Sequence, residues 1–198
     1  MDYLGEIVRL QAQRESLKAG QKLHRYYDPA PITVIPQLTL DAGGVTGHDL
    51  AGALIADVHH RDHPASRYTD GNGVSLGFTA HYDAMRARFG AHVTDGLAGE
   101  NILVQCGRVV HADDLACGLL IVTAEGRDLT LRGATAAEPC VEFSRHVLRY
   151  PREARSDATV TAALAFLRHG MRGYYLTYDG APTRIHVGDR VWACTSDS

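Results

Sequence analysis

The segment ENILVQCGRVV, residues 100–110, opens the stretch of sequence that decides the fold. It is followed by GLLIVTAEG at 118–126 and RDLTLRG at 127–133, and each apolar run is short and is bounded by glycine or charged residues. Short aliphatic runs separated by turn residues are typical of β-strands joined by tight turns. This region therefore predicts several strands that follow one another closely along the chain.

The same pattern of short apolar runs between turn residues continues on both sides of this region. ITVI and LTL, within residues 32–40, are bounded by proline and glycine, and GALIADVHH at 52–60 predicts another strand. Near the C-terminus, residues 173–194 alternate β-type residues around an Asp179-Gly180 turn.

Three helices are predicted among these strands. Residues 79–89 form the first, with Thr79 as N-cap and Gly90 as terminator, and residues 157–169 form the second. Residues 2–19 carry a patchy apolar stripe that ends at Gly20, which predicts a helical arm. A partly solvated helix is favoured over an arm packed on the body or on a partner such as a second copy.

The predicted fold is therefore mainly β with inserted helices. We expect a helical arm over residues 1–29, a closed or nearly closed β-barrel over 30–193 and a tail over 194–198. The regular alternation of strands and helices that a doubly wound α/β fold needs is missing.

Composition excludes several classes of partner. The chain has 198 residues and a formal net charge of −3, which gives no general attraction for nucleic acid or an anionic membrane surface. No apolar run approaches the length that spans a bilayer, and the N-terminus lacks the pattern of a secretory signal. We expect a cytoplasmic protein that acts on a small molecule.

Cysteine usage is consistent with a reducing compartment. Cys106, Cys117, Cys140 and Cys194 form no C-x-x-C pair, which argues against a zinc ribbon, a thioredoxin-type motif and, by spacing, a plant-type iron–sulfur domain. We expect free thiols and no disulfide. Most free cysteines are small buried residues, but Cys140 follows Pro139, whose fixed φ helps to define the approach to the sulfur.

Three stretches taken together resemble a known family. Gly99-Glu100-Asn101-Ile102 opens a predicted strand, Pro139-Cys140 follows some forty residues later, and RGYYLTYDGAPTRIHVGDRVW at 172–192 closes the chain. With the glycine-rich LTLDAGGVTGHD at 38–49, they resemble a stand-alone, bacterial-type member of the MOSC domain family, named after the C-terminal domain of molybdenum-cofactor sulfurase.

The resemblance implies a β-barrel and a site for molybdenum cofactor, a pyranopterin dithiolene that carries molybdenum. It implies that Cys140 is the protein ligand to the metal and the catalytic residue. The cofactor phosphate then needs arginine partners, since arginine can donate two parallel hydrogen bonds to phosphate. The candidates are Arg67, Arg132, Arg145 and Arg172. Relatives often carry arginine just before the Pro-Cys pair, whereas this chain has Glu138 there.

Two further groups of residues are candidates for the pocket wall. Gly99 permits a close backbone approach, Glu100 lies beside it, and Asn101 either contacts the pterin or ties down a turn. His59, His60 and His63 are zinc-type ligands, but neighbouring strand residues point to opposite faces. A plain loop or a share in the pocket wall is therefore favoured over a zinc site.

Three functions remain open at this stage. The first is reduction of N-hydroxylated compounds, with electrons from a separate donor protein. The second is a carrier or sulfurtransferase module that delivers sulfur or cofactor to a partner enzyme. Pyridoxal phosphate is not expected, because the sulfurase domain that binds it is absent. The third is a thiol enzyme in which Cys140, activated by a histidine such as His146, attacks carbon directly.

Overall fold

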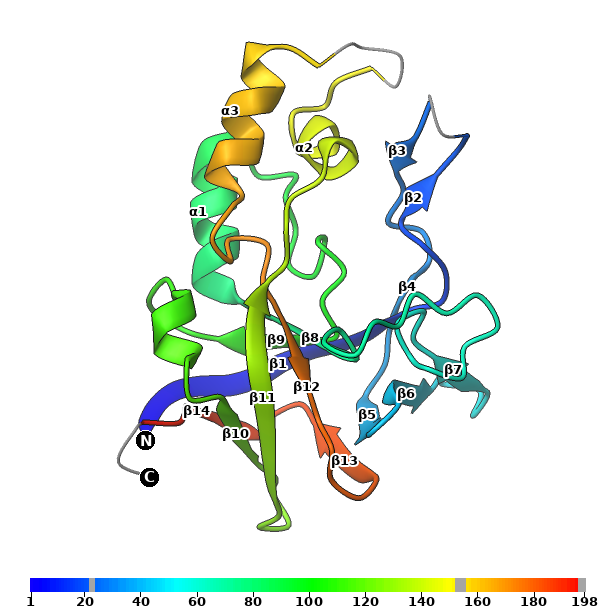
Figure 1. The fold of residues 1–198 in the computed structure, drawn as a ribbon, viewed down its shortest axis with the longest axis vertical. Helices are drawn as coiled ribbons and strands as arrows, with labels where there is room; N and C mark the ends of the chain where they lie inside the picture. The colour runs from blue at the N-terminus through cyan, green and yellow to red at the C-terminus, as the bar shows by residue number, and fades with distance from the viewer. Residues whose placement is uncertain (22–23, 152–155, 196–198) are drawn as a thin grey trace.

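Seven strands close into a barrel in the computed structural model, which describes residues 1–21, 24–151 and 156–195 (Figure 1). Around the barrel the strands run in the order β1 (Asp2–Gln13), β14 (Arg190–Ala193), β10 (Leu119–Val122), β11 (Asp128–Ala136), β12 (Tyr174–Thr177), β8 (Val74–Phe78) and β9 (Ile102–Gln105). β9 pairs with β1 again, which closes the ring. The predicted mainly β barrel with inserted helices is confirmed.

β1 is the strand that closes the barrel. Asp2–Glu6 pair with β14, Glu6–Leu10 pair with β9, and the last residues of β1 pair with the short β4 (Ile32–Val34). Gly5 makes this possible: its φ is +150°, and a Cβ there would lie 1.7 Å from the carbonyl oxygen of Gln105. Only glycine allows the two backbones to approach so closely.

The prediction of a helix over residues 2–19 is wrong, and β1 belongs to the barrel rather than to an arm. The register of β1 shifts between Tyr3 and Gly5 and again near Val8. Each bulge adds one residue to the strand, so that Leu4, Ile7 and Leu10 are all buried although they are three residues apart. A spacing of three on one face is what a helix would produce.

A second sheet packs beside the barrel. It has the order β13 (Thr183–His186), β5 (Gln37–Asp41), β6 (Gly44–His48) and β7 (Leu54–Ala56). The strands predicted near 32–40, 52–60 and 173–194 are thus present. A two-stranded hairpin, β2 (Lys18–Ala19) with β3 (Tyr26–Tyr27), stands opposite the helices in Figure 1. Residues 22–23 of the predicted arm and 196–198 of the predicted tail lie outside the described residues.

The helices gather at one end of the barrel (Figure 1). α1 (Thr79–Phe89) has the predicted bounds and connects the parallel strands β8 and β9, which need such a crossover. The prediction of Thr79 as its N-cap is wrong: the N-cap is Phe78, and the Thr79 hydroxyl donates to the carbonyl oxygen of Cys106. α3 (Ala158–Phe166) begins as predicted, where Asp157 accepts hydrogen bonds from two amides, and ends three residues early. α2 (Val141–Val147) was not predicted, and a short 3-10 turn covers Ala112–Leu115.

Two apolar cores result from this arrangement. One fills the barrel and includes Phe78, Leu76 and Ile121. The other lies under the helices and the hairpin and joins Tyr27, Met85 and Phe143. Among the described residues, none of the helices combines the length and apolar character that a membrane crossing requires.

Candidate functional site

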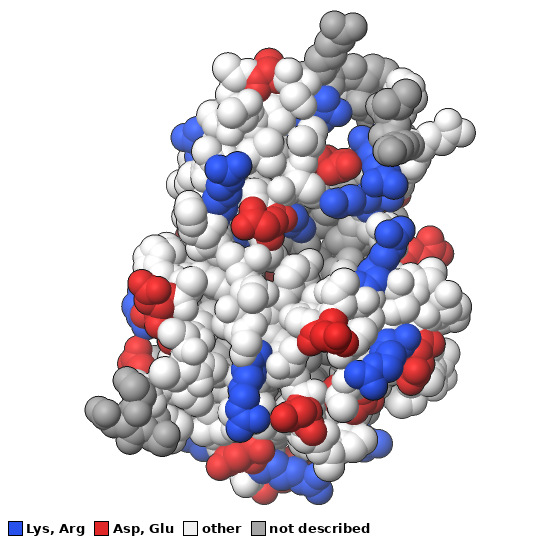
Figure 2. Space-filling model, viewed as in Figure 1, with Lys and Arg blue, Asp and Glu red and all other residues white. Residues whose placement is uncertain are grey.

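A pocket of about 240 Å³ brings together the ends of several elements. Its lining comes from the end of β1, the β2–β3 hairpin, the loop after β7, β8 and the loop before β9. The segment between β11 and α2, Arg172 and the start of β12 complete it. Its polar lining residues are Gln13, Ser16, Lys18, Tyr27, His59, Arg67, Ser75, Glu100, Glu138, Cys140, Arg172, Tyr174 and Tyr175. Figure 2 shows lysine and arginine side chains beside the hollow between the helical end and this hairpin.

Cys140 is half-buried in the wall of this pocket, directly before α2. The Nη1 atom of Arg172 donates to its Sγ at 3.8 Å. All four cysteines are free thiols; Cys106 is buried, Cys117 is exposed, and Cys194 is half-buried. None of these three lines the pocket. Cys140, which the sequence singled out, is therefore the one cysteine of the four that lines this pocket.

Arg172 is held in place by the backbone around the pocket. It donates to the carbonyl oxygens of Glu138 at 3.1 Å and Ala98 at 3.4 Å, and its guanidinium lies 4.7 Å from the centre of the Phe143 ring. Its buried Nε has no partner among the described residues. Burial lowers the pKa of Arg172, but the neighbouring Cys140 and tyrosines outweigh this, and the net shift is upward. The pocket thus carries a fixed positive charge beside the sulfur.

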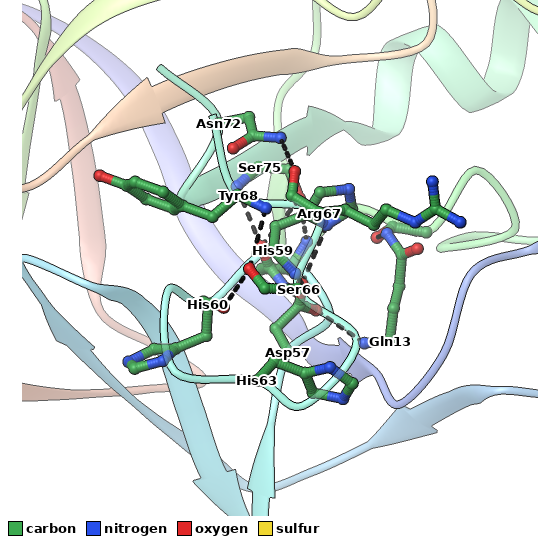
Figure 3. A network of polar contacts seen from close by, with 12 residues as sticks. Gln13, Asp57, His59, His60, His63, Ser66, Arg67, Tyr68, Asn72 and Ser75 are labelled. Carbon is green, nitrogen blue, oxygen red and sulfur yellow. Dashed lines mark hydrogen bonds and ion pairs between the residues drawn. The ribbon is translucent and has the colours of Figure 1, made fainter. Parts of the chain in front are cut away.

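Two more cations line the rim. Arg67 and Lys18 are exposed, and neither side-chain head has a hydrogen-bond or ion-pair partner among the described residues. In Figure 3 the side chain of Arg67 extends away from its loop, on the side where Gln13 lies. The loop itself is fixed, because the amide of Arg67 donates to Val58 and its carbonyl accepts from Asn72. Two free cationic heads beside a fixed one suit an anionic ligand.

Glu100 is the buried acid of the pocket. Its side chain is 4% exposed, the Tyr82 hydroxyl donates to Oε2 at 2.8 Å, and Oε1 has no partner among the described residues. Burial raises the pKa of Glu100 to about 7, although Tyr82 and the charge of Arg172 pull it down. Glu100 can therefore hold or release a proton near neutral pH.

Asn101 lies behind the pocket wall rather than in its lining. Its Oδ1 accepts from the amide and hydroxyl of Ser75, at 3.0 and 2.8 Å, and its Nδ2 donates to Gln11 and Asp57. These bonds tie β8, β9 and β1 together. Of the two roles weighed for Asn101, the structural one fits its position. Gly99 does line the pocket, in a left-handed conformation with φ of +89°.

The three histidines point in different directions. His59 lines the pocket, and its Nδ1 lies 3.0 Å from Oδ1 of the fully buried Asp57. His60 is directed away from Arg67 in Figure 3, with Nε2 3.3 Å from Asp41. Nδ1 of His63 accepts a hydrogen bond from the backbone amide of Ala65 in the same loop. Within the described part of the chain, no three histidine, cysteine or acidic side chains are grouped to hold a metal ion.

Two of the predicted arginines lie elsewhere. Arg132 is exposed and lies 3.5 Å from Asp179. Arg145 lines a second recess with His146 and donates to Ser156 at 3.3 Å. The ring of His146 packs against Tyr27, and it is absent from the lining of the Cys140 pocket. The structure therefore brings Cys140, Arg67, Arg172, Gly99, Glu100 and His59 together. The other candidates, Asn101, Arg132, Arg145, His60 and His63, lie outside the pocket lining.

Sequence reasoning missed Lys18, Tyr27 and Tyr175 as lining residues, and it did not single out the Asp57–His59 pair. The spacing D-x-H within DVHH was the only available signal for that pair. An isolated lysine or tyrosine gives no such signal.

Comparisons with known proteins add the fold alone. No family model and no curated protein matches the chain. A solved structure of a hypothetical protein matches with a TM-score of 0.53 and 10% identity, over 96% of this chain and 67% of that one. The YuaD protein from Bacillus subtilis matches with a TM-score of 0.49 and 15% identity, over 94% of this chain and 96% of the other.

Proposed function

We propose that this chain is a cytoplasmic, MOSC-type enzyme that binds molybdenum cofactor and reduces N-hydroxylated small molecules with electrons from a separate donor protein. The observation that carries the proposal is the contact between Cys140 and Arg172 in a pocket with two further cations, Lys18 and Arg67. A soft sulfur ligand and an anion-binding rim are the two features that such a cofactor requires.

The residues that line this pocket fit molybdenum cofactor in both respects. Cys140 would supply a thiolate to molybdenum, which prefers soft ligands. Arg172, Arg67 and Lys18 would hold the phosphate, and the unpartnered Nε of Arg172 leaves a donor for it. The side chain of Glu138, which replaces the arginine common in relatives, is exposed, and Arg172 occupies the place beside the sulfur instead. When bound, the cofactor would supply the two-electron chemistry.

The test is analysis of protein made in a host that synthesises the cofactor. We expect about one molybdenum and one pterin per chain, and turnover of an N-hydroxylated base or amidoxime with a chemical reductant. Protein without molybdenum or pterin would overturn the proposal. Bound cofactor without turnover would favour a carrier or sulfurtransferase that delivers to a partner enzyme.

A further inference from the structure

A buried carboxylate fixes one histidine of the pocket in a single orientation. Oδ1 of Asp57 accepts from the backbone amide of His59 at 2.9 Å and faces Nδ1 of the same residue at 3.0 Å. Oδ2 accepts from the amide of Gln13 at 2.7 Å and from Nδ2 of Asn101 at 2.8 Å. Both oxygens are thus used as acceptors, which is the pattern of an ionised carboxylate. Figure 3 shows Asp57 at the centre of these contacts.

This arrangement determines the proton positions of the His59 ring. Since Asp57 can only accept, Nδ1 of His59 must carry a hydrogen and donate it. The other nitrogen, Nε2, has no hydrogen-bond partner among the described residues. The side chain of His59 is 14% exposed and belongs to the pocket wall, as Cys140 does. With Nδ1 committed to Asp57, Nε2 is the nitrogen that can take a proton from solvent and pass it to a ligand.

We infer that His59, oriented by Asp57, is the proton donor of the pocket. This inference rests on the proposed function and names the group that protonates the substrate. Reduction of an N-hydroxylated compound breaks the N–O bond with two electrons from the reductant and two protons. One proton joins the departing oxygen, which leaves as water, and the other ends on nitrogen. Nε2 of His59 delivers the proton to oxygen, and solvent restores it.

Asp57 is a positioning residue in this scheme. It keeps the hydrogen on Nδ1, so that the nitrogen available to the ligand is always Nε2. His60 and His63 cannot replace His59, because both lie outside the pocket lining.

The test compares His59→Gln with His63→Gln, a half-buried histidine of the same loop that lies outside the pocket lining. Each variant is purified from the cofactor-synthesising host, and molybdenum content, kcat and KM are measured. We expect both to load molybdenum as the native protein does. In His59→Gln, kcat should fall about 100-fold or more with little change in KM, as for loss of a general acid, and added imidazole should restore part of the rate. His63→Gln should keep native turnover.

A second measurement does not depend on turnover. In cofactor-free native protein, ¹⁵N NMR should show His59 with its hydrogen on Nδ1, and Asp57→Asn should abolish that preference. Native-like turnover in His59→Gln, or a hydrogen found on Nε2 of neutral His59, would overturn the proton-donor role alone. Native protein that holds cofactor but reduces no N-hydroxylated substrate would overturn the proposed function, and the donor role with it.

Discussion

The Nη1 atom of Arg172 lies 3.8 Å from the Sγ of Cys140, although 32 residues separate the two along the chain. The same guanidinium donates to the carbonyl oxygens of Glu138 and Ala98, which flank the pocket on two different loops. Arg172 therefore joins the cysteine loop, the loop before β9 and the start of β12. It has two roles: its hydrogen bonds hold the pocket walls together, and its guanidinium places a positive charge beside the sulfur.

Replacing this arginine by lysine should damage both roles. In Arg172→Lys the planar fork is lost, and one ammonium group cannot serve both carbonyls and the sulfur. We expect a loss of about 1–2 kcal/mol in the free energy of unfolding, visible as a drop of several degrees in the melting temperature, and a marked fall in molybdenum content. Arg132→Lys is the matched control, since Arg132 is exposed and outside the pocket. Equal molybdenum content in the two variants would remove Arg172 from the cofactor site.

The fold was largely predictable because short apolar runs between turns encode strands directly. β1 was not, because its two bulges give Leu4, Ile7 and Leu10 the spacing of a helix face. Bulges depend on pairing with β14 and β9, which no local pattern records. The close approach of the Gly5 backbone to Gln105 of β9, which requires glycine, likewise depends on strand pairing and gives no local signal.

The site was predictable in part for the same reason. Cys140, Glu100 and Gly99 belong to motifs that are visible in the sequence, and they do line the pocket. The choice among four arginines was not predictable, because it depends on which loops meet. Arg172 reaches the pocket from the segment just before β12 and Arg67 from the loop after β7, whereas Arg132 and Arg145 lie elsewhere.

Glu100 should make stability depend on pH. Because burial raises its pKa from 4.5 to about 7, the folded state prefers the neutral carboxyl. Its contribution is fully present below pH 4.5, falls as the pH rises and is lost above about 7, a difference of about 3 kcal/mol. Glu100→Gln stays neutral throughout. Its free energy of unfolding relative to the native protein should therefore rise by that order between pH 4.5 and 8.

Urea unfolding at a series of pH values measures this difference. Glu138→Gln serves as control, because it removes an exposed carboxylate from the same pocket rim. That variant should track the native protein across the range. A constant difference between Glu100→Gln and the native protein would show that Glu100 does not titrate with a raised pKa.

Asn101 should matter for stability rather than through contact with a ligand. Asn101→Ala removes four hydrogen bonds and leaves the buried groups of Ser75, Gln11 and Asp57 short of partners. Unpaired buried groups cost about 1–3 kcal/mol each, so we expect a loss of at least about 3 kcal/mol in urea unfolding. Asn72→Ala, which removes two bonds in an exposed loop, should cost less than about 1 kcal/mol. Similar losses in both would contradict a central role for Asn101.

Cys140→Ser tests the sulfur itself. The hydroxyl is nearly the size of the thiol, and Cys140 is only half-buried, so the melting temperature should change little. The hydroxyl is a harder and far less acidic ligand, and it should not replace a thiolate on molybdenum at neutral pH. Turnover of an N-hydroxylated substrate with a chemical reductant should disappear while the barrel stays folded. Cys117→Ser and Cys194→Ser, both outside the pocket, should keep native activity, and any harm from Cys106→Ser should come through packing in the core. Full turnover in Cys140→Ser would assign the sulfur a packing role and require another ligand for the metal.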